Sequence, residues 1–548
     1  MNYSRLELHI EEHMQQAHVP ALALAVVNER EILYARGFGL TSVEEGGASV
    51  SPRTVFRIGS VTKPLVGTAV MRLVEDGQLD LDRPLKAYID WLRFSMPHAE
   101  ERITLRMLLS HTAGLPADSR SGASNSDGLE RYVREQIPRY SFIALPGRLY
   151  SYANAGFSLA GYVAQVVTGK GFADLMQQLV FDPLEMKHTT FDPREVLTYP
   201  FALPHILRDG QLRVLHHISY GQAIAPAGGA YSTVLDLAHF AMMHLQNGRF
   251  HDRQLLSASS VMQMHTQQAV RYLPYPAGYG LSFEQRIYRG IPCIGHSGSM
   301  STFGCQLMLL PEKKLAFVLM VSRISFMQRL VSVLLDHLLS LPEATVRPST
   351  NEPERTLWPR YLGSFLGART GLARISVEDD HLVLGLNGQR LSLQAYSATV
   401  YVGYCPGSDV PIAVGFILDD VGPVRSITID EKPCERFEAD PLFSPNPFTW
   451  LSYSGIYREE NNGETITIQV TNEQLLLRLH DIDDNVKEGV GIPISETRFT
   501  WAGGLIEFQV AEDGTVPVLT AMKVYKFKRL EEENDTQIKT LPGPSKKR

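Results

Sequence analysis

The strongest constraint on the fold is an internal repeat in the last third of the chain. The segment Tyr361-Leu-Gly-Ser-Phe365 corresponds to Tyr453-Ser-Gly-Ile-Tyr457. Further matches at the same offset of 92 or 93 residues are Ile375, Val377, Leu382, Leu384, Leu386, Phe416 and Gly422 with Ile468, Val470, Leu475, Leu477, Leu479, Phe508 and Gly514. Short, mostly apolar runs of this kind are typical of strands in small closed barrels. The repeat therefore predicts two similar antiparallel β-barrels, over residues 357–437 and 450–530.

The first 340 residues have a different pattern, which mixes helices and strands. Helical spacing begins at Leu6 and ends near Pro20, and further helices are expected over Val61–Val74, Ser232–Leu245 and Met327–Leu339. Strands are expected over Ala21–Val27, in a hairpin with Ile32–Tyr34, and over Thr302–Leu310 and Leu315–Val321. Residues 341–356 and 438–449 are rich in proline and are predicted to be linkers. The charged tail over 531–548 is predicted to be disordered.

Composition excludes several classes of function. The chain has 548 residues, with 52 Lys and Arg against 59 Asp and Glu, so its net charge is −7. This balance argues against a nucleic-acid binder, which usually carries a strong basic patch. No apolar run approaches the roughly 18 residues that span a bilayer, and the N-terminus lacks a signal-peptide pattern, so we expect no membrane and a cytoplasmic location. The four cysteines form no CxxC pair, so neither a metal site nor a disulfide scaffold is expected.

The first candidate for chemistry is Ser60-Val-Thr-Lys63, at the start of a predicted apolar helix. Positions i and i+3 share one face of a helix, so the Lys63 amine can lie next to the Ser60 hydroxyl. A serine hydroxyl is a weak nucleophile until a neighbouring base accepts its proton, and a lysine can be that base when its surroundings favour the neutral amine. Taken alone, this pattern is more often a helix cap followed by a solvated charge.

Two further short motifs follow along the chain. Tyr152-Ala-Asn154 presents a phenol, which can exchange a proton, and an amide, which can hold a carbonyl. Gly295-His296-Ser-Gly298-Ser299 precedes a predicted strand, and a glycine-bearing strand edge lets a substrate backbone lie close to an N–H donor. Each motif alone is more often a packed aromatic beside a turn, or a glycine turn with a surface histidine.

Two other interpretations of these residues fail on spacing. The nucleophile elbow of α/β-hydrolases needs Gly-x-Ser-x-Gly before a helix, whereas the segment from Gly295 ends in Ser299 and precedes a strand. The pair His216-His217 belongs to no HExxH motif, so it does not indicate a zinc site.

Together and in this order, the three motifs resemble the signatures of the penicillin-recognising serine hydrolases. The pattern is closest to the class C β-lactamase-like group, which includes D-aminopeptidases, carboxypeptidases and esterases. The stretches Phe56–Pro64, Leu108–Pro116 and Pro226–Thr233 are also similar to that family. The resemblance implies an α+β fold over residues 1–340, with an antiparallel sheet flanked by helices and a helical subdomain. The better-known members combine Ser-x-x-Lys with Ser-Asp-Asn and Lys-Thr-Gly, and this chain differs in the second and third motifs.

The resemblance also implies roles for the matching residues. Ser60 would attack the substrate carbonyl, with Lys63 and Tyr152 sharing the proton transfers. Asn154, His296 and Gly298 would orient the substrate, and the backbone N–H groups of Ser60 and Ser299 would form the oxyanion hole. No cofactor is implied.

Histidine in place of lysine at position 296 bears on the substrate, because histidine is mostly neutral near pH 7. This disfavours substrates that end in a carboxylate. With the two barrels, it favours a D-aminopeptidase-like activity on small amides or peptides. An esterase, acyl transferase or β-lactamase of the same family remains open, and so does a sensor that is acylated without turnover. The expected partner is a small amide, peptide or ester, and a homo-oligomer is compatible with the sequence. The segment Asp118–Leu129 is predicted to be a surface loop.

Overall fold

The computed structural model describes residues 3–117, 128–216, 221–325, 327–341, 351–408, 410–440, 442–459, 463–480, 486–501 and 504–530. Most of the predicted loop Asp118–Leu129, most of the first linker and the charged tail lie outside these residues. The chain divides into two compact units, one of residues 1–366 with 373–436 and the other of residues 367–372 with 437–548. The first barrel thus belongs to the same unit as the large N-terminal part of the chain. Among the described residues, no helix combines the length and apolar character that crossing a membrane requires.

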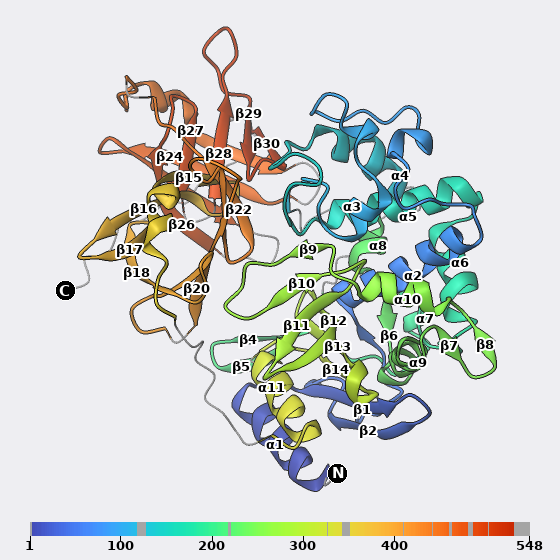
Figure 1. The fold of residues 1–548 in the computed structure, drawn as a ribbon. Helices are drawn as coiled ribbons and strands as arrows, with labels where there is room; N and C mark the ends of the chain where they lie inside the picture. Colours follow the sequence, from blue (N-terminus) through green and yellow to red (C-terminus); the bar gives the residue numbers. More distant parts are fainter. Residues whose placement is uncertain are drawn as a thin grey trace. The chain divides into compact units, whose positions relative to one another are not determined.

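An eight-stranded antiparallel sheet forms the centre of the N-terminal part (Figure 1). Its strands in spatial order are β2 (Ile32–Gly39), β1 (Ala21–Asn28), β14 (Leu315–Val321), β13 (Phe303–Leu310), β12 (Ile291–Met300), β11 (Glu284–Tyr288), β10 (Ala277–Tyr279) and β9 (Ala269–Val270). The expected hairpin at residues 21–34 is present as β1 and β2. The strand with the His296 motif is not at the edge of the sheet, because β11 pairs with it on one side and β13 on the other.

Helices cover both faces of this sheet. On one face, Leu22, Leu24 and Val26 of β1 pack in a cluster with α1 (Tyr3–Gln16) and α11 (Met327–Leu338). The alternate residues of β1 are Ala21, Ala23, Ala25 and Val27, and they point to the opposite face because successive side chains of a strand alternate. There α9 (Val234–Leu245) packs against β1 and β14. Small side chains on that face let the helix approach the sheet closely.

A helical region lies beside the sheet and holds the site. Its main helix is α2 (Thr62–Glu75), which packs against α5 (Asn154–Thr168) and α8 (Ala225–Gly228). Other helices of the N-terminal part are α3 (Leu105–Leu109), α4 (Gly128–Arg131), α6 (Phe172–Met176), α7 (Pro193–Val196) and α10 (Ala258–His265). Every α2 residue from Thr62 to Leu73 except Arg72 is buried, so this part of the helix is surrounded by protein rather than by solvent.

The repeat forms two closed eight-stranded barrels, as predicted. The first contains β15 (Gly363–Gly367), β16 (Gly371–Glu378), β17 (His381–Leu386), β18 (Gln389–Ala395), β19 (Val400–Tyr404), β20 (Pro411–Ile417), β21 (Ser426–Ile429) and β22 (Lys432–Arg436). The second contains β23 (Gly455–Glu459), β24 (Thr465–Thr471), β25 (Gln474–His480), β26 (Val486–Pro493), β27 (Arg498–Trp501), β28 (Gly504–Gln509), β29 (Val518–Ala521) and β30 (Tyr525–Arg529).

Matching residues of the repeat make matching contacts inside the two barrels. Tyr361 stacks on Phe416 with ring centroids 3.9 Å apart, and Tyr453 stacks on Phe508 at 4.3 Å. Stacked aromatic pairs of this kind stabilise a core beyond the area that they bury. The repeat in the sequence therefore records one core arrangement used twice.

Candidate active site

Ser60 lies in a short 3₁₀ turn, Gly59–Val61, directly before α2. Gly59 has a φ of +51°, and a Cβ atom there would come within 2.7 Å of the backbone nitrogen of Ser299. Glycine is therefore required at position 59, both for its positive φ and for the close approach of β12. Ser60 itself is only partly buried, so its hydroxyl is accessible at the start of the helix.

Lys63 follows one turn later, and its side chain is fully buried. Its amine Nζ donates hydrogen bonds to Ser60 Oγ at 3.0 Å, to Asn154 Oδ1 at 2.8 Å and to the carbonyl of Ala227 at 2.7 Å. Asn154 is the first residue of α5 and Ala227 lies in α8. Two helices thus hold the amine against the serine hydroxyl.

Tyr152 approaches Ser60 from the segment before α5, and its hydroxyl donates to Ser60 Oγ at 2.7 Å. Its ring lies 4.7 Å from Lys63 Nζ, and His111 packs against it with ring centroids 4.2 Å apart. The Nδ1 atom of His111 accepts a hydrogen bond from the backbone N–H of Ala153 at 3.1 Å. His111 thereby supports both the ring and the backbone of the Tyr152 segment.

The pKa of His111 is lowered well below its usual value, first by burial and then by the nearby charge of Lys63. It is therefore neutral near pH 7, in agreement with its role as an acceptor. His111 was not among the predicted site residues, although it lies within the Leu108–Pro116 stretch that resembles the family.

His296 is also held in a neutral form, within β12. Its Nδ1–H donates to the carbonyl of Ser297 at 2.6 Å, and its Nε2 accepts from the Tyr279 hydroxyl at 2.9 Å. Burial lowers its pKa to about 4, and the charges of Lys63 and Arg271 act in the same direction, while Glu284 opposes them. The imidazole is 1% exposed, so it lies beneath the surface of the site and supports its surroundings rather than presenting a cation.

Gly298 brings β12 against the turn that carries Ser60. A Cβ atom at this position would come within 2.0 Å of the carbonyl oxygen of Ile58 and within 3.1 Å of the backbone nitrogen of Val61. Two close approaches, at Gly59 and at Gly298, therefore place the backbone of Ser299 beside that of Ser60. This is the arrangement that a pair of converging N–H donors needs.

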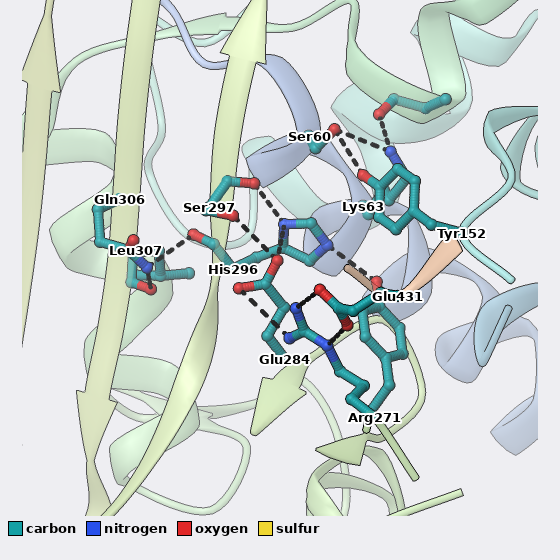
Figure 2. A network of polar contacts seen from close by, with 12 residues as sticks. Ser60, Lys63, Tyr152, Arg271, Glu284, His296, Ser297, Gln306, Leu307 and Glu431 are labelled. Atoms are coloured by element: carbon teal, nitrogen blue, oxygen red, sulfur yellow. Dashed lines mark hydrogen bonds and ion pairs between the residues drawn. The ribbon is translucent and has the colours of Figure 1, made fainter. Parts of the chain in front are cut away.

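A second group of polar residues lies behind Ser297 and was not predicted (Figure 2). The Ser297 hydroxyl donates to Glu284 Oε1 at 2.9 Å. The guanidinium of Arg271 donates through Nε and Nη2 to the two carboxylate oxygens of Glu431, with 2.9 Å for the Nη2 bond. These four residues line a cavity of about 230 Å³. Glu431 comes from the turn between β21 and β22 of the first barrel, so only the tertiary structure could reveal the group.

The Glu284 carboxylate and the Arg271 guanidinium are both held in their charged forms. Burial acts to raise the pKa of Glu284, but the charge of Arg271 and the hydrogen bond from Ser297 act in the opposite direction, and this pKa is lowered. Burial likewise disfavours the charged form of Arg271, but its hydrogen bonds to Glu431 and the neighbouring negative groups raise its pKa. The guanidinium also lies 5.7 Å from the ring of Tyr150.

The structure brings most of the predicted site residues together. Ser60, Lys63, Tyr152 and Asn154 form one hydrogen-bonded group, as Figure 2 shows for the first three. The backbones of Gly298 and Ser299 lie against the turn that carries Ser60. His296 is joined instead to Tyr279 and to its own strand.

Comparison with known proteins agrees with this geometry. The family model "Beta-lactamase" matches residues 6–331, more than half of the chain. The chain therefore belongs to the beta-lactamase family of serine hydrolases. Its relatives include a penicillin-binding protein.

Individual relatives are distant. Protein flp of Staphylococcus aureus (strain MW2) is 24% identical over 315 residues, which cover 57% of this chain and 61% of flp. Penicillin-binding protein 4 of Amycolatopsis lactamdurans is 27% identical over 352 residues, 61% of this chain and 91% of that protein. The fold is also similar to that of SurE in a crystal structure with D-Leu, at a TM-score of 0.62 and 24% identity over 79% of this chain and 99% of SurE.

Proposed function

We propose that the chain is a serine hydrolase that acts through an acyl-enzyme on small amide or peptide substrates. One observation carries this proposal: Ser60 Oγ lies within hydrogen-bond distance of both Lys63 Nζ, at 3.0 Å, and the Tyr152 hydroxyl, at 2.7 Å. Lys63 as a neutral amine can accept the Ser60 proton, and a serine with such a base beside it is an activated nucleophile.

In the acylation step, Ser60 Oγ bonds to the substrate carbonyl carbon while its proton passes to the neutral amine of Lys63. The negative charge that develops on the carbonyl oxygen is met by the backbone N–H groups of Ser60 and Ser299. Loss of one such donor typically reduces turnover by about 10²–10³. The bond from the carbonyl carbon to the leaving nitrogen then breaks, and the Tyr152 hydroxyl gives its proton to that nitrogen and becomes a phenolate.

Deacylation repeats the sequence with water. The Tyr152 phenolate accepts a proton from the water, whose oxygen bonds to the acyl carbon. The bond to Ser60 Oγ then breaks as the Lys63 ammonium returns the proton to the serine. Asn154 holds Lys63 in place through its Oδ1 atom at 2.8 Å and can contact the substrate amide. The products are a free acid and an amine.

We propose that the substrates lack a terminal carboxylate. Amides and short peptides with an N-terminal D-amino acid are the first class to test. Support comes from the neutral state of His296, which burial maintains down to about pH 4. SurE, which shares the fold, was crystallised with D-Leu, and this makes the D series the natural starting point.

A panel of chromogenic substrates tests the proposal. D-alanine p-nitroanilide, its L enantiomer, p-nitrophenyl butyrate and nitrocefin are each incubated with the full chain and with a Ser60→Ala variant. We expect turnover of the D-anilide above that of the L-anilide, abolished in Ser60→Ala, with a covalent acyl adduct on Ser60 detected by intact-protein mass spectrometry.

The other outcomes separate the alternatives. Preferential turnover of the butyrate ester or of nitrocefin would make the chain an esterase or a β-lactamase. A stable adduct on Ser60 without turnover would indicate a sensor. Turnover that survives Ser60→Ala would overturn the proposal as a whole.

A further inference from the structure

We propose that Glu431, contributed by the first barrel, determines substrate specificity by occupying Arg271 as a built-in carboxylate, so that carboxylate-bearing substrates are excluded from the site. The inference takes the hydrolysis reaction at Ser60 from the proposed function and adds which substrates are excluded. The pairing itself can be tested by binding alone.

The geometry of the pair is that of a bound carboxylate. Arg271 directs Nε and Nη2 at the two oxygens of Glu431, the forked arrangement in which a guanidinium recognises a carboxylate with two parallel bonds. The Arg271 side chain is 13% exposed and that of Glu431 is 24% exposed. A substrate carboxylate would therefore find this donor set already filled.

The second donor in the cavity is filled in the same way. The hydroxyl of Ser297, next to His296 on β12, donates to Glu284 at 2.9 Å. Glu284 also lies 3.9 Å from Arg271 Nη1, which is too far for a hydrogen bond. The cavity, which Gly295 and Ser297 line on either side of His296 in the chain, thus has a serine hydroxyl and a guanidinium that could bind an anion, and the protein supplies a carboxylate to each.

The repeat provides an internal comparison for Glu431. At an offset of 92 residues, Asp430 and Glu431 of the first barrel correspond to Met522 and Lys523 of the second, and all four have a positive φ between 46° and 65°. The turn therefore has the same backbone form in both barrels. It does not itself require an acidic residue, because the second barrel has a lysine at this position.

Two other positions in the first barrel are adapted to the same contact surface. A Cβ atom on Gly415 of β20 would lie 2.1 Å from the Cβ atom of Tyr272, the neighbour of Arg271, so glycine lets the barrel approach closely. Asp419 accepts a hydrogen bond from Arg148 at 2.9 Å. The corresponding residues of the second barrel are Glu507 and Ala511. Asp419 thus anchors the first barrel without contacting Arg271 and offers a matched control.

The test compares binding of N-acetyl-D-alanine with binding of its neutral isostere N-acetyl-D-alaninamide, by calorimetric titration of the full chain. The measured quantity is the ratio of the two affinities, carboxylate over amide. Glu431→Gln removes the negative charge and one of the two acceptor atoms from the Arg271 fork. We expect this ratio to rise by about tenfold or more, because a substrate carboxylate then competes with a neutral amide, and charge-assisted hydrogen bonds are stronger than neutral ones. In Asp419→Asn the ratio should equal that of the native chain.

The double variant Arg271→Gln/Glu431→Gln should return to the native ratio, because the liberated cation is then absent. Since Glu431→Gln leaves a buried cation without its partner, circular dichroism melting is recorded for each variant. If it does not fold, Glu431→Asp, which shortens the side chain by one methylene, should raise the ratio in the same direction by a smaller factor.

An unchanged ratio in a folded Glu431→Gln or Glu431→Asp variant would overturn the inference, and so would an equal rise in Asp419→Asn, which would mean that the barrel contact acts only as an anchor. Because the probes need no turnover, failure of the substrate panel would leave this result interpretable. Turnover by the native chain with an unchanged ratio would remove the inference and keep the proposed function.

Discussion

At the scale of single residues, the site depends on the environment of one hydroxyl. Ser60 Oγ receives hydrogen bonds from a fully buried amine and from a phenol that is partly exposed. The buried partner, Lys63, is held by oxygen atoms from two different helices. Two groups that can exchange protons therefore lie next to a serine hydroxyl that a substrate can still reach.

Removing the nucleophile should abolish turnover without damage to the fold. In Ser60→Ala we expect the rate to fall by about 10⁴–10⁶, as for other covalent nucleophiles. Because Ser60 is partly exposed at a helix start, its replacement by alanine leaves no large cavity. Steady-state kinetics and thermal melting check this prediction. More than a tenth of the native rate at a normal melting temperature would contradict the assignment.

The two tyrosines near the site should respond very differently to loss of the hydroxyl. Tyr152→Phe removes the group that lies 2.7 Å from Ser60 Oγ, and a proton-transferring phenol is typically worth about 10²–10⁴ in rate. Tyr150→Phe is the matched control, because the Tyr150 ring packs against Tyr279 and keeps that contact without its hydroxyl. Comparable losses of kcat in the two variants would show that the roles are wrongly assigned.

At the scale of elements, the contact between β12 and the Ser60 turn sets the geometry of the site. Gly59 faces the backbone of Ser299, and Gly298 faces the backbone of Ile58, at distances that no side chain tolerates. These contacts fix the position of the turn before α2 relative to β12. Such preorganisation matters because a displacement of about 1 Å can reduce a rate by about 10²-fold.

Widening this contact should therefore impair catalysis. In Gly298→Ala the new methyl group would meet the Ile58 carbonyl, and we expect kcat/KM to fall by about 10²-fold as the turn moves away from Ser299. The control is Gly385→Ala in β17, where the nearest backbone atom would lie 3.7 Å from the new Cβ atom. Native activity in Gly298→Ala would mean that β12 does not set the position of Ser60.

At the scale of the whole molecule, several buried histidines make the protein sensitive to acid. Burial lowers the pKa of both His265 and His296 to about 4, and those of His111 and His244 are also well below the ordinary value of 6.5. The unfolded chain therefore binds more protons than the folded one between pH 6.5 and about 4. The free energy of unfolding should be highest above pH 6.5 and should fall as the pH drops through this window.

The expected loss for His265 and for His296 is on the order of 3 kcal/mol each by pH 4. Urea unfolding at half-unit steps from pH 7.5 to 4 measures it, and the slope should be smaller in His265→Gln, which removes one titrating ring. A free energy of unfolding that stays constant over this range would show that the rings titrate normally in the folded state.

Much of the architecture could be predicted from the sequence because it depends on local patterns. The repeat at 92–93 residues predicted the two barrels, since each copy must bury the same apolar and aromatic positions, such as Phe416 and Phe508. The strand Ala21–Val27 could be identified because it is an unbroken apolar run, as expected for a strand in which every position is buried. Ser60 and Lys63 are three residues apart, and their contact follows from helix geometry alone.

The tertiary structure alone decided which distant residues join this pair. Arg271, Glu284 and Glu431 carry no local signal, because an arginine or a glutamate at a strand end or in a hairpin turn is common wherever it faces solvent. The ion pair of Arg271 and Glu431 joins residues that are 160 positions apart in the sequence. It forms only when the turn of the first barrel packs against the segment that contains Arg271. His296 shows the same limit: its position was expected, but its neutral state depends on complete burial, and burial is a property of the packed molecule rather than of the segment that contains the residue.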